Sequence, residues 1–134
     1  MEVATQEQAH QKPARVLVVD DDQDVRALLS SFLGCEGYEV ITAMDGEEAL
    51  NQVHSEHPDL ILLDLQMEGM GGLQTMEKLK ETRSQAPVVL LTGHPEFLAP
   101  RQATCLDISG LVGKPFRGME LLSTISRALA EKGR

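Results

Sequence analysis

The stretch Asp59-Leu60-Ile61-Leu62-Leu63-Asp64-Leu65 sets an unbroken apolar run between two aspartates. A run this short, without helical period, is typical of a strand that is buried on both faces of a parallel sheet. Three other runs have the same character: Val16 to Asp20, Val88 to Thr92 and Ile108 to Val112. A fifth run, Tyr38 to Ala43, alternates more and predicts a strand nearer an edge. We therefore expect five strands.

Segments with a helical period lie between these strands. Their apolar residues recur at steps of three and four over residues 25–33, 47–54, 73–83 and 119–130. Residues 95–104 predict only a short or broken helix, because Pro100 removes a backbone donor. Alternating strands and helices indicate right-handed crossovers. The expected fold class is α/β, with a five-stranded parallel sheet, doubly wound, and helices on both faces.

Composition narrows the class of protein further. The 134 residues are 42% hydrophobic and 25% charged, as expected for one globular domain. A formal charge of −9 would repel a phosphate backbone, so we expect no direct nucleic-acid partner. The sequence contains neither an apolar run of the roughly 20 residues that span a bilayer nor an apolar secretory segment near Met1. We expect no membrane partner and a cytoplasmic location.

Polar residues follow the apolar runs, at the sheet edge where ligands bind in open parallel sheets. Three acids follow the first run at 20–22, Asp64 ends the third in the chain, Thr92 ends the fourth, and Lys114 follows the fifth. Converging carboxylates repel one another, and a hard divalent cation with oxygen ligands keeps them ionised. Mg²⁺ is the expected cofactor, with Mn²⁺ as a substitute. Lys114 and Thr92 can bind phosphate oxygens, so the set predicts phosphorylation of a carboxylate.

Some of these acids have an ordinary structural interpretation. Asp22 or Asp24 could cap the helix that begins near Val25. Asp64 is harder to explain in that way, since a charge at the end of an apolar strand needs a cation or donors.

Five motifs occur in an order and spacing that resemble the receiver domain of bacterial response regulators. They are Val16-Leu17-Val18-Val19-Asp20-Asp21, Asp59 to Leu65, Gly69-Met70-Gly71-Gly72-Leu73, Val89-Leu90-Leu91-Thr92-Gly93 and Lys114-Pro115-Phe116. The resemblance runs from about Arg15 to Leu129. It implies the flavodoxin-like strand order 2-1-3-4-5. We expect a flexible tail over 1–14, a receiver domain over 15–131 and a short tail over 132–134.

The resemblance also implies a role for each site residue. Asp64 would be the phosphoacceptor and, with Asp21 directly, Asp20 through water and the backbone carbonyl of Gln66, would bind Mg²⁺. Thr92 would be the switch hydroxyl, and Lys114 would pair with the phosphoryl group. The donor would be the phosphohistidine of a sensor histidine kinase or a phosphotransfer protein. The receiver would catalyse only its own phosphorylation and dephosphorylation, and its partner would be a downstream protein or an output domain absent from this chain.

The sequence departs from the family pattern in places that affect signalling. Leu111 stands where the family often has an aromatic residue, and Glu68 where it usually has proline. Pro95 and Pro100 make the segment after Thr92 unusual. Gln66 and His94 lie two positions after Asp64 and Thr92, and we hypothesise that they set the lifetime of the acyl phosphate.

Two rival functions remain open. An aspartyl-phosphate phosphatase needs a second acid two residues after its nucleophile, where this chain has Gln66. A receiver-like module that binds partners without phosphorylation is the stronger rival, because the changes at Leu111 and Pro100 could alter output alone.

Overall fold

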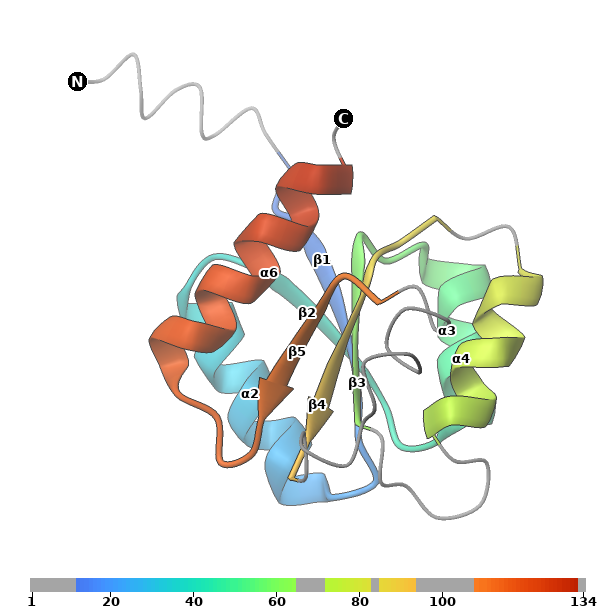
Figure 1. Ribbon diagram of the computed structural model, residues 1–134, viewed down its shortest axis with the longest axis horizontal. Helices are drawn as coiled ribbons and strands as arrows, with labels where there is room; N and C mark the ends of the chain where they lie inside the picture. The colour runs from blue at the N-terminus through green and yellow to red at the C-terminus, as the bar shows by residue number, and fades with distance from the viewer. Residues whose placement is uncertain (1–11, 65–71, 83–84, 94–107, 133–134) are drawn as a thin grey trace.

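The computed structural model describes residues 12–64, 72–82, 85–93 and 108–132 (Figure 1). Five parallel strands form one sheet in the order β2-β1-β3-β4-β5. The strands are β1 (Arg15–Val19), β2 (Glu39–Ala43), β3 (Leu60–Asp64), β4 (Val88–Thr92) and β5 (Gly110–Gly113). The described helices are α2 (Gln23–Cys35), α3 (Gly46–Glu56), α4 (Gly72–Glu81) and α6 (Gly118–Lys132). The predicted fold class and strand order are confirmed.

Helices cover both faces of the sheet (Figure 1). On one face, Leu29 and Leu33 of α2 pack with Leu121 and Ile125 of α6 against inward-facing strand residues. On the other face, α3 and α4 contribute the buried residues Ala49, Val53, Met76 and Leu79. β3 and β4 are buried along their whole length because both faces are covered. The apolar faces of the helices thus pack against the two faces of one sheet.

The observed elements differ from the predicted ones in detail. β3 and β4 have the predicted limits, and the described helices begin and end within about two residues of them. The prediction that Ile108 to Val112 is buried on both faces was wrong, because β5 is an edge strand and only Val112 in it is buried. The predicted segment 95–104 lies outside the described residues.

The start of α2 separates the two capping candidates. Asp22 is the N-cap residue, and its carboxylate accepts hydrogen bonds from the main-chain N–H groups of Asp24 and Val25. Asp24 lies in the first turn, where a negative charge suits the helix dipole, so the suggestion that it caps the helix was wrong. These hydrogen bonds fix the turn between the end of β1 and the start of α2.

Candidate functional site

The carboxyl ends of four adjacent strands bring the predicted site residues to one edge of the sheet. Asp20 follows β1, Asp64 ends β3 and Thr92 ends β4. Lys114 follows β5 directly. The register aligns Val19 with Leu63, Asp64 with Leu91 and Thr92 with Gly113, so these ends lie level with one another. Residues far apart in the sequence therefore meet in one place.

Three carboxylates form the centre of this edge. One oxygen from each of Asp20, Asp21 and Asp64 lies within 4.8 Å of the others. Asp20 and Asp64 are buried, whereas Asp21 is exposed. Two of these carboxylates are buried and one is open to solvent, so solutes can reach this acidic cluster from the Asp21 side.

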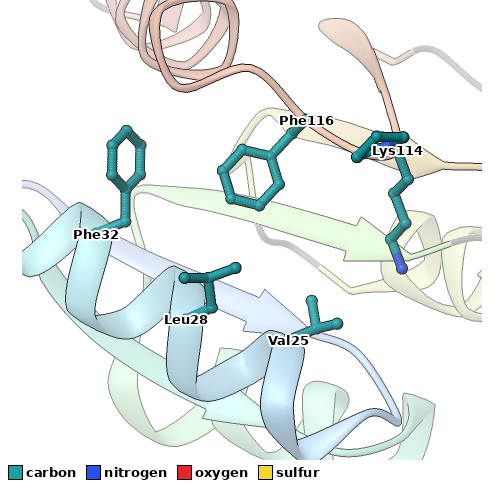
Figure 2. A pocket seen from close by; sticks show the side chains of 6 residues that line it. Val25, Leu28, Phe32, Lys114 and Phe116 are labelled. Atoms are coloured by element: carbon teal, nitrogen blue, oxygen red, sulfur yellow. The ribbon is translucent and has the colours of Figure 1, made fainter.

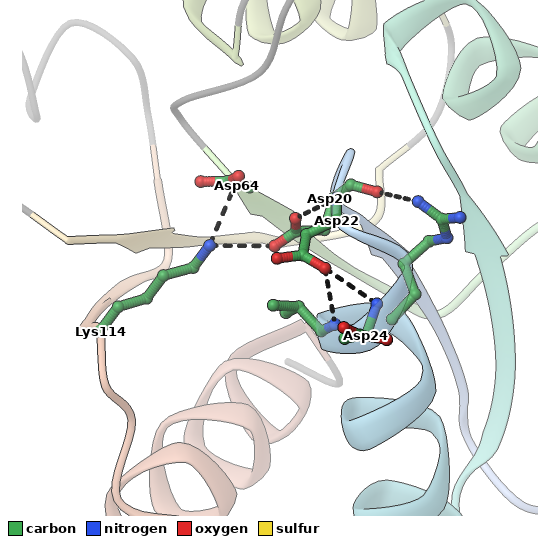
Figure 3. Close-up of polar contacts among 7 residues, drawn as sticks. Asp20, Asp22, Asp24, Asp64 and Lys114 are labelled. Carbon is green, nitrogen blue, oxygen red and sulfur yellow. Dashed lines mark hydrogen bonds and ion pairs between the residues drawn. The ribbon is translucent and has the colours of Figure 1, made fainter.

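Lys114 brings a positive charge to the carboxylates (Figure 3). Its Nζ lies 3.0 Å from Oδ2 of Asp20 and 3.4 Å from Oδ2 of Asp64. Burial lowers the pKa of Lys114, but its hydrogen bond to Asp20 and the charges of Asp64 and Asp20 outweigh burial and raise that pKa above 10.5. The ammonium therefore stays charged at neutral pH and links the two buried carboxylates.

Asp20 is held at its backbone as well as at its carboxylate. Its N–H donates to the carbonyl of Ala43 at 3.1 Å, and its Oδ1 accepts from the N–H of Asp22 at 2.9 Å. Arg26 in α2 donates from Nη1 to the carbonyl of Asp20 at 2.7 Å. Arg26 was not among the predicted site residues, although a cation in the first turn of a helix opposes the helix dipole and could have marked it. These contacts fix the direction of the Asp20 side chain.

Thr92 lies beside the carboxylates at the end of β4 and is only 2% exposed. Its carbonyl accepts a hydrogen bond from the N–H of Lys114 at 2.7 Å, and the peptide bond between Lys114 and Pro115 is cis. The remaining predicted site residues, Gln66 and His94, lie outside the described residues. The structure thus brings together five of the seven predicted residues: Asp20, Asp21, Asp64, Thr92 and Lys114.

The donor set suits a hard divalent cation. Carboxylate oxygens are the ligands that Mg²⁺ takes in proteins, and Mg²⁺ keeps some positions for water or phosphate. Lys114 offsets part of the repulsion between Asp20 and Asp64, while Asp21 faces solvent from which an ion can enter. Asp20, Asp21 and Asp64 could therefore hold Mg²⁺.

The chain is similar to known proteins in family pattern, in sequence and in fold. The family model described as the response regulator receiver domain matches residues 16–126. The transcriptional regulatory protein YkoG of Bacillus subtilis is 37% identical over 88% of this chain and 52% of its own length. The alkaline phosphatase synthesis regulator PhoP of the same organism is 34% identical over 86% of this chain and 48% of its own length. The chain spans about half the length of these relatives.

Solved structures agree with these matches. The chemotaxis protein CheY4 of Vibrio cholerae, crystallised at low pH, superposes with a TM-score of 0.77 at 32% identity, over 87% of this chain and 98% of that one. NtrX of Brucella abortus superposes with a TM-score of 0.83 at 32% identity, over 90% of this chain and 28% of that one. Within the described ranges, no helix is both long and apolar enough to cross a membrane.

Proposed function

We propose the following function for this chain, which belongs to the response regulator receiver domain family. Asp64 accepts a phosphoryl group from the phosphohistidine of a sensor histidine kinase or of a phosphotransfer protein, in a Mg²⁺-dependent reaction. The observation that supports this most strongly is Lys114, whose ammonium lies between Asp64 and Asp20. A cation there can pair with a phosphoryl oxygen as soon as Asp64 is modified.

The side chains around Asp64 have distinct parts in this reaction. The Asp64 carboxylate attacks phosphorus in line with the leaving group, while Lys114 stabilises charge on the phosphoryl oxygens. Asp20 and Asp21, together with Asp64 and the backbone carbonyl of Gln66, are the residues that would hold the metal ion. Bound Mg²⁺ would supply positive charge to the phosphoryl oxygens as charge spreads over them in the transition state.

Signalling would follow from the same modification. The Thr92 hydroxyl, buried beside Asp64, would hydrogen-bond the new phosphoryl group and so couple it to the chain after β4. Leu111 packs against the core beneath α3 and α4, so no aromatic ring at that position takes part in the switch. Gln66 and His94 would tune how fast the acyl phosphate hydrolyses.

The partners belong to the same proposal. The receiver would occupy residues 15–131, between tails at 1–14 and 132–134, and act in the cytoplasm. It would be a signalling module that modifies only itself. Because the chain spans about half of its curated relatives, its target would be either a separate protein or an output domain on a longer chain.

Intact mass spectrometry tests the phosphoacceptor directly. The protein is incubated with acetyl phosphate and MgCl₂ and compared with Asp64→Asn, and with Asp24→Asn as a matched control from the exposed first turn of α2. We expect a gain of about 80 Da in the wild type and the control, abolished by EDTA and absent from Asp64→Asn. MnCl₂ should replace MgCl₂.

Two results would contradict the proposal. A gain that persists in Asp64→Asn would place the modification on another residue. No gain in the wild type with acetyl phosphate or with a phosphorylated donor kinase, despite measurable Mg²⁺ binding, would favour a module that binds its partners without phosphorylation.

A further inference from the structure

An apolar groove runs along α2 to the site. It has a volume of about 450 Å³ and is lined by Val25, Leu28, Phe32, Lys114, Pro115 and Phe116. Val25, Leu28 and Phe32 lie at helical spacing on one side of α2, and the other wall is the segment that follows β5 (Figure 2). A volume of this size is in the range of small-molecule sites.

The two ends of the groove differ. At one end, the rings of Phe32 and Phe116 lie 6.0 Å apart and tilted by 46°. Phe32 is backed by Gly118, where an added Cβ would come within 2.9 Å of the ring. At the other end, the stem of Lys114 lines the groove while its ammonium reaches Asp20 and Asp64 (Figures 2 and 3). The groove is therefore lined by apolar side chains along α2 and ends at Lys114, whose ammonium contacts Asp64.

Leu28 gives the groove an open apolar floor. Its side chain is 57% exposed in the middle of the stripe on α2. A single exposed leucine is ordinary, but Leu28 lines a groove that also contains Lys114. A ligand that fits both parts has an anionic head at Lys114 and an apolar tail over Leu28.

We propose that this groove binds the apolar acyl chain of a small phosphodonor, so that the site accepts acyl phosphates with a medium-length chain in preference to acetyl phosphate. The inference rests on the proposed function, because it assigns a donor class to Asp64. An Asp64 oxygen forms a bond to phosphorus, and the bond between phosphorus and the acyl carboxylate oxygen breaks. The carboxylate leaves with the electron pair, and no proton or redox partner is needed.

Donor kinetics measure the preference. Phosphorylation of the full chain in MgCl₂ is followed by intact mass at increasing acetyl phosphate or hexanoyl phosphate. We expect the half-saturating concentration to be about tenfold lower for hexanoyl phosphate, close to what two buried methylene groups provide, with a similar maximal rate. Leu28→Ser should remove this difference by raising the half-saturating concentration of hexanoyl phosphate to that of acetyl phosphate. Met119→Ser, at an 84% exposed methionine outside the groove, should leave the difference intact.

Direct binding separates this inference from the proposed function. Hexylphosphonate cannot transfer its phosphoryl group, and we expect it to shift the methyl NMR signals of Val25 and Leu28 in the wild type but not that of Val25 in Leu28→Ser. Equal half-saturating concentrations for both donors, with Asp64 phosphorylated normally, would contradict acyl-chain binding in the groove but would leave Asp64 as the phosphoacceptor. A preference lost equally in Met119→Ser would also overturn it. If neither donor phosphorylates Asp64, the proposed function fails, and the absence of any hexylphosphonate shift would reject the groove independently.

Discussion

Lys114 and Asp20 form a 3.0 Å ion pair across 94 positions of the sequence. The pair joins the segment after β5 to the end of β1, and it lies at the centre of the site because Asp64 is 3.4 Å from the same ammonium. Asp20 is only 1% exposed, so the lysine replaces much of the water that its carboxylate gave up on folding.

The first prediction concerns removal of that cation. Lys114→Met leaves two buried carboxylates facing each other, and we expect the free energy of unfolding to fall by about 1–2 kcal/mol in EDTA. Saturating MgCl₂ should restore most of it, since a divalent cation compensates the same charges. Urea unfolding followed by circular dichroism measures both values. An equal loss with and without Mg²⁺ would mean that the lysine acts through packing instead.

Lys78→Met is the matched control for this variant. Lys78 is exposed on α4, away from the carboxylates, so its loss should change the free energy of unfolding little in either buffer.

Asp22 provides the second prediction, because it separates helix capping from metal binding. Asp22→Ala removes the acceptor for the N–H groups of Asp24 and Val25, and we expect a loss of about 1 kcal/mol. Asp22→Asn should keep most of the stability, since its carbonyl oxygen can accept the same bonds. Mg²⁺ affinity, measured by calorimetry, should stay within about threefold in both variants because each keeps the Asp22 N–H that holds Asp20. A large loss of affinity in Asp22→Asn would instead make Asp22 a ligand.

The sequence predicted the fold well because its signals were strong and local. β3 and β4 are continuous apolar runs bounded by turns, and they have the predicted limits. The edge position of β5 was not predicted. A strand of Gly110, Leu111, Val112 and Gly113 has an apolar composition whether or not its outer edge is paired. Burial at an edge depends on neighbouring elements, which local composition does not contain.

The site was predictable to the extent that strand ends are predictable. Asp20, Asp64 and Lys114 could be placed together because parallel strands end at one edge. The role of Arg26 could not, because its hydrogen bond to the Asp20 carbonyl depends on how α2 turns back over β1. The groove along α2 likewise depends on the packing of Phe116 against Phe32, which no local pattern specifies.

The third prediction uses the chain's single tyrosine and its lack of tryptophan. Burial, and to a smaller extent the charge of Glu36, raises the pKa of Tyr38 above 10.0. The unfolded chain therefore ionises first, and stability contributed by Tyr38 is present below pH 10.0 and lost as the pH rises through the folded pKa. Tyrosinate absorbance should titrate above pH 10.0 in the native protein and near that value in urea. Glu36→Gln should lower the native midpoint only slightly, and a native midpoint at or below the urea value would contradict the assignment.

The fourth prediction concerns how closely α6 approaches the edge strand. A Cβ at Gly110 would lie 2.5 Å from Cγ2 of Thr124, and the Thr124 hydroxyl is held by a hydrogen bond to the carbonyl of Glu120. The methyl cannot move away without breaking that bond or shifting the helix, so we expect Gly110→Ala to lower the free energy of unfolding by about 1–3 kcal/mol. Adding Thr124→Ser removes Cγ2 and keeps the hydroxyl. The double variant should regain most of the loss, whereas Thr124→Ser alone should cost little. Urea unfolding of all four proteins gives the coupling energy, and additive losses would show that the contact with the Thr124 methyl does not set the requirement for glycine at position 110.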